Sequence, residues 1–426
     1  MKTLIISHNP ISTVNNNGKT MLTLFSTFKE EELCQLYVAP AMPDVIKCKS
    51  YFRITDKDVL KSYYKFYVKG KEITSSDIDT NTHLQYESEK DEKLYRNVKN
   101  KKPVRALLRD MMWGGAHWYT KKLASWITSQ NPTNIFVVPG SSIFLYKIAL
   151  KIAKKFNLPI VTYVGDGYYF VKASKGLIAK LQQARLKKAI SKLMAKSSHL
   201  VAICDELSSE YSNYFKIPTT TVMTGSYFDL SPKSKQMVVN QLFYMGNIRC
   251  KRYNSLAEIG RTIDIINNEF NTDFKLNIYT SEKDNSILKT FEGIQSITLR
   301  QFVSGEEFNK IFSSAPALVH VEDFDNDSVD LVKYSMSTKI SDSLSSGVCL
   351  FAYGPSNVAS ISYLIRNDCA IVCTDKNLLK EQLVKVFFDH EIKEKAVQKA
   401  LKLAHKNHQS RVVSTAVYNI LSRNSK

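Results

Sequence analysis

The chain has 426 residues, enough for two compact domains of about 200 residues each. Apolar residues make up 44% of the sequence and charged residues 23%, a composition that excludes wholesale disorder. Lys and Arg total 59 against 40 Asp and Glu, and the formal net charge of +19 favours a partner that carries negative charge.

The cysteines and histidines predict neither a disulfide scaffold nor a metal centre. The seven cysteines are odd in number and include no Cys-x-x-Cys pair, and the eight histidines form no cluster with metal-ligand spacing. We therefore expect no metal and no cofactor. An apolar run of only three residues precedes Ser7, and no apolar run approaches the roughly 18 residues of a membrane span. These features predict a cytoplasmic protein, peripheral at most on the inner face of the cell membrane.

In the first half of the chain, short apolar runs alternate with amphipathic stretches, as in parallel sheets flanked by helices. Strands are predicted over residues 3–6, 35–38, 135–138, 160–164 and 200–203. Helices are predicted over residues 142–156 and 205–215. The polar segment 69–102 interrupts this alternation, and we expect an insertion or surface loop there.

A second alternation follows a polar linker at 231–235. Its predicted strands cover residues 242–245, 274–279, 296–299, 317–321, 348–352 and 370–373. Residues 378–422 are predicted to be almost continuously helical. The fold class is therefore α/β, with Rossmann-like domains at 1–230 and 231–426 that face each other across a cleft. The C-terminal helices are expected to pack back on the N-terminal domain. Parallel sheets bind ligands at the carboxyl ends of their strands, so the candidate residues lie there.

The first candidate motif follows the first predicted strand, where Gly18 and Lys19 open a helix. Glycine permits close backbone approach, and a helix N-terminus favours an anion. Thr13 stands where a Walker A loop requires glycine, which excludes a P-loop. A turn that uses Gly18 only for backbone reasons is the alternative. His8, in the same turn, either lines the acceptor side or is structural.

The second motif follows the strand at 242–245, where Gly246 and Asn247 precede three cations, Arg249, Lys251 and Arg252. Backbone N–H groups and guanidinium groups both complement phosphate oxygens, so the motif predicts a diphosphate pocket. An exposed basic loop is the alternative.

The third motif is the start of a helix at Ser337, Thr338 and Lys339, with Asp342 expected in its first turn. Free N–H groups and the Lys339 ammonium would bind an anion, and the Asp342 carboxylate would accept hydrogen bonds from ribose hydroxyls. An ordinary capped helix packed on a sheet is the alternative.

In their order along the chain, these motifs resemble glycosyltransferase family 4, the group 1 glycosyltransferases of bacterial surface-polysaccharide type. The resemblance implies a GT-B fold. It also implies that Gly18 and Lys19 lie beside the donor phosphates, that Gly246 and Arg252 bind the diphosphate, and that Asp342 holds the ribose.

The sequence departs from the family pattern at three positions. Tyr334, in the donor-binding set, stands where the family has the first Glu of its Glu-x7-Glu pair, and Asp342 stands where it has the second. Cys349 stands where the family has proline.

Two acidic residues are candidates for catalysis. Asp166 ends a predicted strand between two glycines and would contact the acceptor, unless it only forms the turn. Glu322 follows another strand end and opens an acidic segment that would contact the transferred sugar, unless that segment is simply solvated.

No acidic residue occurs between Asp166 and Asp205. The cations of this stretch include a helical face of Lys180, Lys187, Lys188 and Lys192, opposite an apolar face. This pattern predicts contact with an anionic membrane surface, and Leu177 and Leu181 among the lysines would enter the lipid. A solvated face is the alternative. Nucleic acid is not expected, because no aromatic residue is interleaved with these cations.

The function predicted from the sequence is transfer of a sugar from a nucleoside diphosphate sugar to a lipid-linked or polysaccharide acceptor in bacterial surface-glycan synthesis. The resemblance implies retention at the anomeric carbon. Cations and helix N-termini would stabilise the departing diphosphate without a metal. Two alternatives stay open: a nucleotide-sugar 2-epimerase and a non-catalytic GT-B-like scaffold.

Overall fold

The computed structural model describes residues 1–13, 16–65, 69–80, 103–172, 176–228 and 239–425. It forms two compact units. Unit 1 comprises Met1–Thr224 and Val413–Lys426, and unit 2 comprises Gly225–Val412. The chain thus enters unit 2 a few residues before position 230, and its C-terminal end belongs to unit 1. The polar linker expected at 231–235 lies outside the described residues.

Unit 1 is built on a sheet with the strand order β4-β3-β2-β1-β5-β6-β7-β8, in which β3 and β4 are antiparallel and all other neighbours are parallel. Its strands are β1 (Thr3–Ser7), β2 (Leu33–Tyr37), β3 (Ser50–Arg53), β4 (Lys71–Thr74), β5 (Asn134–Val138), β6 (Ile160–Val164), β7 (Ser197–Ala202) and β8 (Thr219–Thr221). The central strands β1, β2, β5 and β6 are buried along almost their whole length, as expected for a sheet with helices on both faces.

The α-helices of unit 1 are α1 (Asn16–Leu24), α2 (Asp56–Lys65), α4 (Pro103–Gly115), α5 (Lys121–Gln130), α6 (Ile143–Phe156), α7 (Leu177–Met194) and α8 (Asp205–Phe215). The end of the chain completes the unit through α17 (Ser410–Arg423). The Ser414 hydroxyl accepts a hydrogen bond from the Thr27 N–H at 3.0 Å, and the Asn134 side chain donates to the Leu421 carbonyl at 3.2 Å.

Unit 2 contains a fully parallel sheet with the order β11-β10-β9-β12-β13-β14. Its strands are β9 (Gln241–Met245), β10 (Lys275–Thr280), β11 (Ile297–Gln301), β12 (Ala317–Val321), β13 (Cys349–Tyr353) and β14 (Ile371–Cys373). In both units the strand order runs outward in two directions from the first strand, which is the Rossmann arrangement. The order reverses between β1 and β5 in unit 1, and between β9 and β12 in unit 2.

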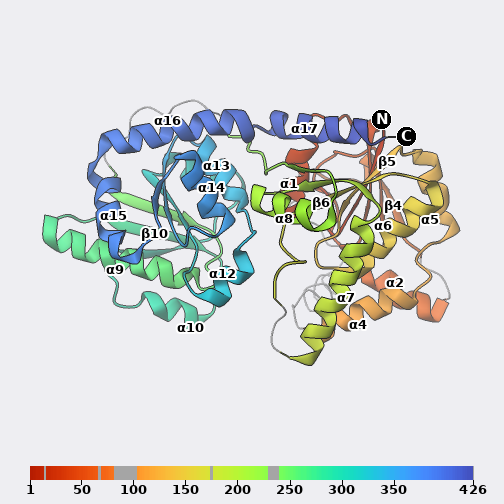
Figure 1. The fold of residues 1–426 in the computed structure, drawn as a ribbon, viewed down its shortest axis with the longest axis horizontal. Helices are drawn as coiled ribbons and strands as arrows, with labels where there is room; N and C mark the ends of the chain where they lie inside the picture. Colours follow the sequence, from red (N-terminus) through yellow and green to blue (C-terminus); the bar gives the residue numbers. More distant parts are fainter. Residues whose placement is uncertain (14–15, 66–68, 81–102, 173–175, 229–238, 426) are drawn as a thin grey trace. The chain divides into compact units, whose positions relative to one another are not determined.

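Helices lie on both sides of the unit 2 sheet, with α9 on one side and α16 on the other (Figure 1). The α-helices are α9 (Arg252–Phe270), α10 (Asn285–Leu288), α11 (Gly305–Ser314), α12 (Asn326–Val332), α13 (Thr338–Ser345), α14 (Ala359–Asn367), α15 (Leu379–Phe388) and α16 (His390–Asn407). The core between sheet and helices is apolar and aromatic, and the rings of Phe274 and Phe387 stack within it at 4.0 Å between centroids.

The segment 69–102, expected to be an insertion or loop, contains a strand. β4 pairs antiparallel with β3 at the edge of the unit 1 sheet, and only Ile73 of β4 is buried. Because an edge strand with one buried residue carries almost no apolar pattern, neither its existence nor its partner could be predicted. Residues 81–102 lie outside the described part of the chain.

Candidate functional site

The reversal of strand order in unit 2 brings the ends of β9 and β12 together. Gly246 follows β9, and Glu322 follows β12. Ligands of such sheets bind beyond the carboxyl ends of the strands at the point where the order reverses. This edge of the sheet also receives Lys339 from the first turn of α13, and we therefore place the candidate site there.

Gly246 and Lys339 are in close contact. A Cβ atom built on Gly246 would lie 2.7 Å from the Lys339 Nζ, so the missing side chain provides the room that the ammonium occupies. The turn is fixed on both sides: the Gly246 N–H donates to the Tyr279 carbonyl at 2.9 Å, and the Tyr244 hydroxyl donates to the Asn247 carbonyl at 2.7 Å. A positive charge is thereby held against the backbone at the strand end.

Arg252 and Glu322 form a buried, bidentate ion pair at the same edge. The Arg252 Nε and Nη2 donate to the two Glu322 carboxylate oxygens at 2.9 and 2.8 Å. Glu322 is only 2% exposed. Burial raises the pKa of the Glu322 carboxyl, and Arg252 opposes that rise. Burial also lowers the pKa of Arg252, but Glu322 outweighs this and keeps it above its ordinary value.

The sequence prediction gave Arg252 to the donor diphosphate and Glu322 to an acidic loop around the sugar, and it did not include their pairing. The Glu322 backbone is also tied down, because its N–H donates to the Tyr353 carbonyl and its carbonyl accepts from the Ser255 hydroxyl. A Cβ on Gly354 would lie 3.1 Å from the Glu322 Cβ, so Gly354 allows the close packing. Glu322 is therefore a buried partner of Arg252 in this structure, and it does not stand on a solvated loop.

His320 lies next to the ion pair, and the sequence gave it no role. Its Nε2 is 3.0 Å from the Ser360 hydroxyl and 3.8 Å from a Glu322 carboxylate oxygen. Burial, with Arg252 and Lys339 nearby, lowers the pKa of His320 to about 3. The ring is thus neutral at neutral pH. The only signal for His320 in the sequence was its position in the alternation of side chains along β12. That alternation does not distinguish a histidine at the site from one that only packs in the core.

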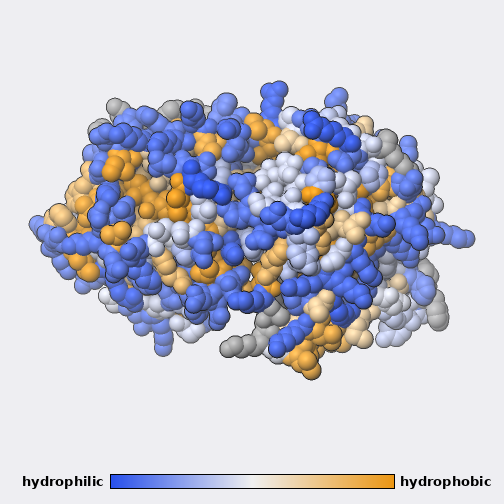
Figure 2. All heavy atoms as spheres, in the orientation of Figure 1, coloured by the Kyte–Doolittle hydropathy of each residue, from blue (hydrophilic) through white to orange (hydrophobic). Residues whose placement is uncertain are grey.

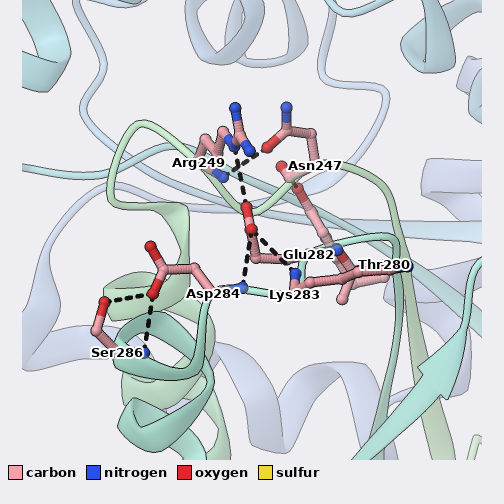
Figure 3. Close-up of polar contacts among 8 residues, drawn as sticks. Asn247, Arg249, Thr280, Glu282, Lys283, Asp284 and Ser286 are labelled. Atoms are coloured by element: carbon pink, nitrogen blue, oxygen red, sulfur yellow. Dashed lines mark hydrogen bonds and ion pairs between the residues drawn. The ribbon is translucent and has the colours of Figure 1, made fainter.

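The two other cations after Gly246 also have carboxylate partners. Arg249 pairs with Glu282 at 3.0 Å, and the Asn247 side chain accepts from the Arg249 N–H at 2.7 Å (Figure 3). Hydrogen bonding from Arg249 lowers the pKa of Glu282. Lys251 pairs with Asp325 at 2.9 Å. The cations after Gly246 are therefore balanced by acids from two other segments of unit 2, the one after β10 and the one after β12.

The third motif forms the helix that it predicts, with Ser337 as N-cap of α13 and its hydroxyl accepting from the Lys339 N–H at 3.4 Å. The Thr338 carbonyl accepts from the Ser341 hydroxyl. Asp342 lies one turn further along than expected, and its carboxylate accepts from the Ser226 hydroxyl at 2.7 Å. Tyr334 is buried, and the Lys333 Nζ lies 5.1 Å from its ring centroid.

In unit 1, the candidates lie at the carboxyl edge of that sheet. His8 follows β1, and its carbonyl accepts from the Val38 and Ala39 N–H groups. Gly18 and Lys19 are in the first turn of α1, where Gly18 is buried and Lys19 is exposed. Asp166 follows β6 and accepts from the Tyr168 hydroxyl at 2.9 Å.

Two residues that support the loop after β1 were missed. The Gln35 side chain accepts from the Ile11 N–H and donates to the Asn9 carbonyl. The Asp44 carboxylate accepts from the Thr13 N–H at 3.0 Å and from the Ser12 hydroxyl. Neither residue is near this loop in sequence, so no local pattern could have indicated them.

The four lysines predicted to contact a membrane all lie on α7. Lys180, Lys188 and Lys192 are exposed. Lys187 is half-buried, and its Nζ lies 5.5 Å from the centroid of the Tyr169 ring. Lys187 therefore lies over the Tyr169 ring, while the other three lysines are exposed to solvent.

Within the part of the chain that the structure describes, no group of three or more His, Cys, Asp or Glu residues is arranged to hold a metal ion. In the same described ranges, no helix has the length and apolar character needed to cross a membrane.

No protein-family model matches the sequence. No curated protein matches it either. Solved structures match over the whole chain. Sucrose-phosphate synthase from Thermosynechococcus elongatus has a TM-score of 0.62 at 8% identity, with 99% of each chain covered. HepE from Anabaena in complex with UDP has a TM-score of 0.61 at 8% identity, covering 99% of this chain and 100% of HepE. WaaG, a glycosyltransferase of lipopolysaccharide biosynthesis, has a TM-score of 0.55 at 10% identity, covering 97% and 98%.

These similarities, together with the two Rossmann-like units, identify the fold of the chain as the GT-B fold of glycosyltransferases. The expected α/β fold class, with two Rossmann-like domains of GT-B type, is thereby confirmed.

Proposed function

We propose that the chain is a glycosyltransferase whose unit 2 binds the diphosphate of a nucleoside diphosphate sugar at Gly246 and Lys339. The observation that carries the proposal is the Lys339 ammonium held against Gly246 where the strand order reverses. Arg252 and Glu322 carry opposite charges and His320 is uncharged. The Lys339 ammonium adds a positive charge at this edge of the sheet. That charge and the start of α13 would stabilise the departing diphosphate.

The finer parts of the proposal concern the donor, the acceptor and the place of reaction. HepE has been solved with UDP and with UDP-glucose, which makes uridine nucleotides the first donors to test. We propose a lipid-linked or polysaccharide acceptor, reached at the inner face of the membrane, with retention at the anomeric carbon and no metal. Asp166 and His8 at the carboxyl edge of the unit 1 sheet are the proposed acceptor-side residues.

A non-catalytic scaffold of the same fold is the second candidate. It is favoured by the carboxylate partners of all three cations after Gly246 and by the buried Tyr334 in place of an acid. A scaffold would need no diphosphate pocket, so donor binding separates the two candidates.

The test is the thermal stability of the full chain with UDP, GDP, ADP and their sugar conjugates, and with CMP and CMP-linked sugars, followed by product analysis with radiolabelled donor. A nucleotide at about 100 times its Kd stabilises the folded state by roughly 2.7 kcal/mol. We expect one nucleotide class to stabilise the wild type and Lys339→Gln to abolish the effect. Lys310→Gln, an exposed lysine on α11, is the matched control and should respond as the wild type does. If no nucleotide stabilises the wild type, the glycosyltransferase proposal fails and the scaffold replaces it.

A further inference from the structure

Two neighbouring helices of unit 1 expose large apolar side chains. On α4, Val104, Leu108 and Met111 are 46%, 59% and 58% exposed. Their spacing of four and three residues places them on one face of the helix. On the first turns of α7, Leu177 and Leu181 are 83% and 50% exposed and share a face in the same way. Such side chains normally lie in the core, so two outward-facing stripes require an explanation.

A third helix extends this surface with aromatic residues. On α2, Tyr63 and Tyr64 are 49% and 86% exposed. The Tyr63 hydroxyl donates to the Met112 carbonyl of α4, and the Gln182 side chain of α7 donates to the Asp110 carboxylate of α4. These hydrogen bonds join the helices, so their exposed side chains form one surface, hereafter the α2–α4–α7 surface.

The charge of α4 and α7 is almost entirely positive, whereas α2 adds Asp58 and Asp56, and Asp56 pairs with Arg109 of α4 at 3.0 Å. Helices α4 and α7 carry seven cations, Arg105, Arg109, Lys180, Arg185, Lys187, Lys188 and Lys192. Their one carboxylate, Asp110, is 4% exposed and is bonded to Gln182. Figure 2 shows hydrophobic side chains at the tip where α7 begins, directly beside hydrophilic ones. Apolar and cationic groups therefore occupy the same edge of unit 1.

We propose that the α2–α4–α7 surface docks unit 1 on an anionic lipid bilayer. Aliphatic side chains would enter the acyl boundary, Tyr63 and Tyr64 would lie at the headgroup level, and the lysines would bind lipid phosphates. This proposal assigns the membrane contact of the proposed function to particular helices. Its biological purpose rests on that proposed function. It also extends the contact beyond the lysines of α7 to α4 and α2.

Two features favour lipid over a macromolecular partner. Protein interfaces are depleted of lysine, whereas α7 presents three exposed lysines and no exposed carboxylate. Single-stranded nucleic acids are bound by aromatic stacking combined with cations. The exposed aromatic residues named on this surface, Tyr63 and Tyr64, lie on α2, whereas α4 and α7 combine their cations with aliphatic side chains. A surface of aliphatic side chains and phosphate-binding cations has the chemistry of a bilayer interface.

The experiment is co-sedimentation of the full chain with vesicles of phosphatidylcholine alone or mixed with phosphatidylglycerol. We expect binding to the anionic vesicles only, weakened by salt. The combined variant Leu108→Ser, Leu177→Ser and Leu181→Ser should lower the partition coefficient by about a hundredfold or more, because each buried leucine contributes strongly. The matched control is Ile265→Ser, Leu299→Ser and Leu378→Ser, which removes exposed apolar side chains of unit 2 and should bind as the wild type does.

A spectroscopic arm tests insertion directly. Tryptophan emission of Leu177→Trp should shift to shorter wavelength with anionic vesicles, whereas that of Ile265→Trp should not. Equal binding to neutral and anionic vesicles would overturn the proposal. Unchanged vesicle binding by the combined variant Leu108→Ser, Leu177→Ser and Leu181→Ser would also overturn it. A third outcome would also overturn the proposal: the wild type binds no vesicles but self-associates, and the combined variant does not self-associate. That result would assign the surface to a second copy of the chain.

Stabilisation by the nucleotide is measured on the same variants. Retained nucleotide binding with lost vesicle binding supports docking as a separate property of unit 1. Vesicle binding by a chain that binds no nucleotide would support docking and contradict the proposed donor site, so the two failures are distinguishable.

Discussion

Arg252, the first residue of α9, holds Glu322, the residue after β12, through two hydrogen bonds of 2.9 and 2.8 Å. The two residues lie 70 positions apart in the chain. Their side chains fasten the helix that follows β9 to the end of the neighbouring strand, so the edge of the sheet that carries the candidate site depends on this pair.

Removal of one partner of this pair should destabilise unit 2. Arg252→Ala leaves the Glu322 carboxylate buried without its guanidinium, which costs about 3–5 kcal/mol in comparable buried pairs. Replacement of both partners, Arg252→Met with Glu322→Leu, should recover much of that loss because no buried charge remains. The measurement is chemical denaturation of each variant. Lys251→Ala, which breaks an exposed pair with Asp325, should have a much smaller effect. A stable Arg252→Ala chain that only loses nucleotide binding would instead make Arg252 a phosphate ligand.

The neutral His320 predicts a specific dependence of stability on pH. Its pKa is lowered to about 3 in the folded chain, from an ordinary value near 6.5 in the unfolded chain. The unfolded state therefore binds the extra proton first as pH falls. The contribution of His320 is fully present above about pH 6.5 and is lost towards pH 3, with a slope approaching about 1.4 kcal/mol per pH unit. Denaturation of wild type and His320→Gln between pH 7 and about pH 5 measures this slope. Parallel curves for the two proteins would show that His320 does not titrate as described.

The strands that the sequence predicted well are those buried in the middle of the sheets. The bounds of β6 and β12 were predicted to the residue, because both strands are short apolar runs that end at polar or glycine residues. β3 was missed because it ends in Arg53, a charged residue whose guanidinium is buried and donates to the Pro40 carbonyl at 3.0 Å. Hydropathy alone assigns such a residue to the surface, and only the tertiary partner explains its burial.

In the candidate site, too, the residues that lie in local motifs could be predicted, and the contacts made over long distances in the chain could not. Gly246 and Lys339 could be proposed because each lies in a local motif at a strand end or helix start. The partners of Arg249, Lys251 and Arg252 could not, because their carboxylates come from 33, 74 and 70 residues further along the chain. The pairing of these three cations depends on those long-range contacts, which no local pattern in the sequence indicates.

Gly246 and Lys339 should act as one unit in nucleotide binding. In Gly246→Ala, the new Cβ would lie 2.7 Å from the Lys339 Nζ and would displace the ammonium. The ammonium is the flexible end of a side chain, so stability should change little. Affinity for the stabilising nucleotide should fall by about tenfold or more, as expected for loss of a charged hydrogen bond of about 1.5–3 kcal/mol. Isothermal titration calorimetry of both single variants and the double variant with Lys339→Gln tests this. Losses that simply add would place the two residues in separate contacts.

The role of Asp342 is tested through the sugar of the nucleotide. The Ser226 hydroxyl donates to one Asp342 carboxylate oxygen at 2.7 Å and thereby orients the carboxylate. If this carboxylate accepts ribose hydroxyls, Asp342→Ala should weaken binding of the preferred nucleotide by about tenfold or more, and Ser226→Ala by less. Both penalties should disappear with the 2′,3′-dideoxy form of the same nucleotide, which lacks the hydroxyl donors. Lys310→Gln, on α11, is the control and should bind both forms as the wild type does. An equal penalty for the two nucleotides would assign Asp342 to the structural contact with Ser226 and remove it from the donor site.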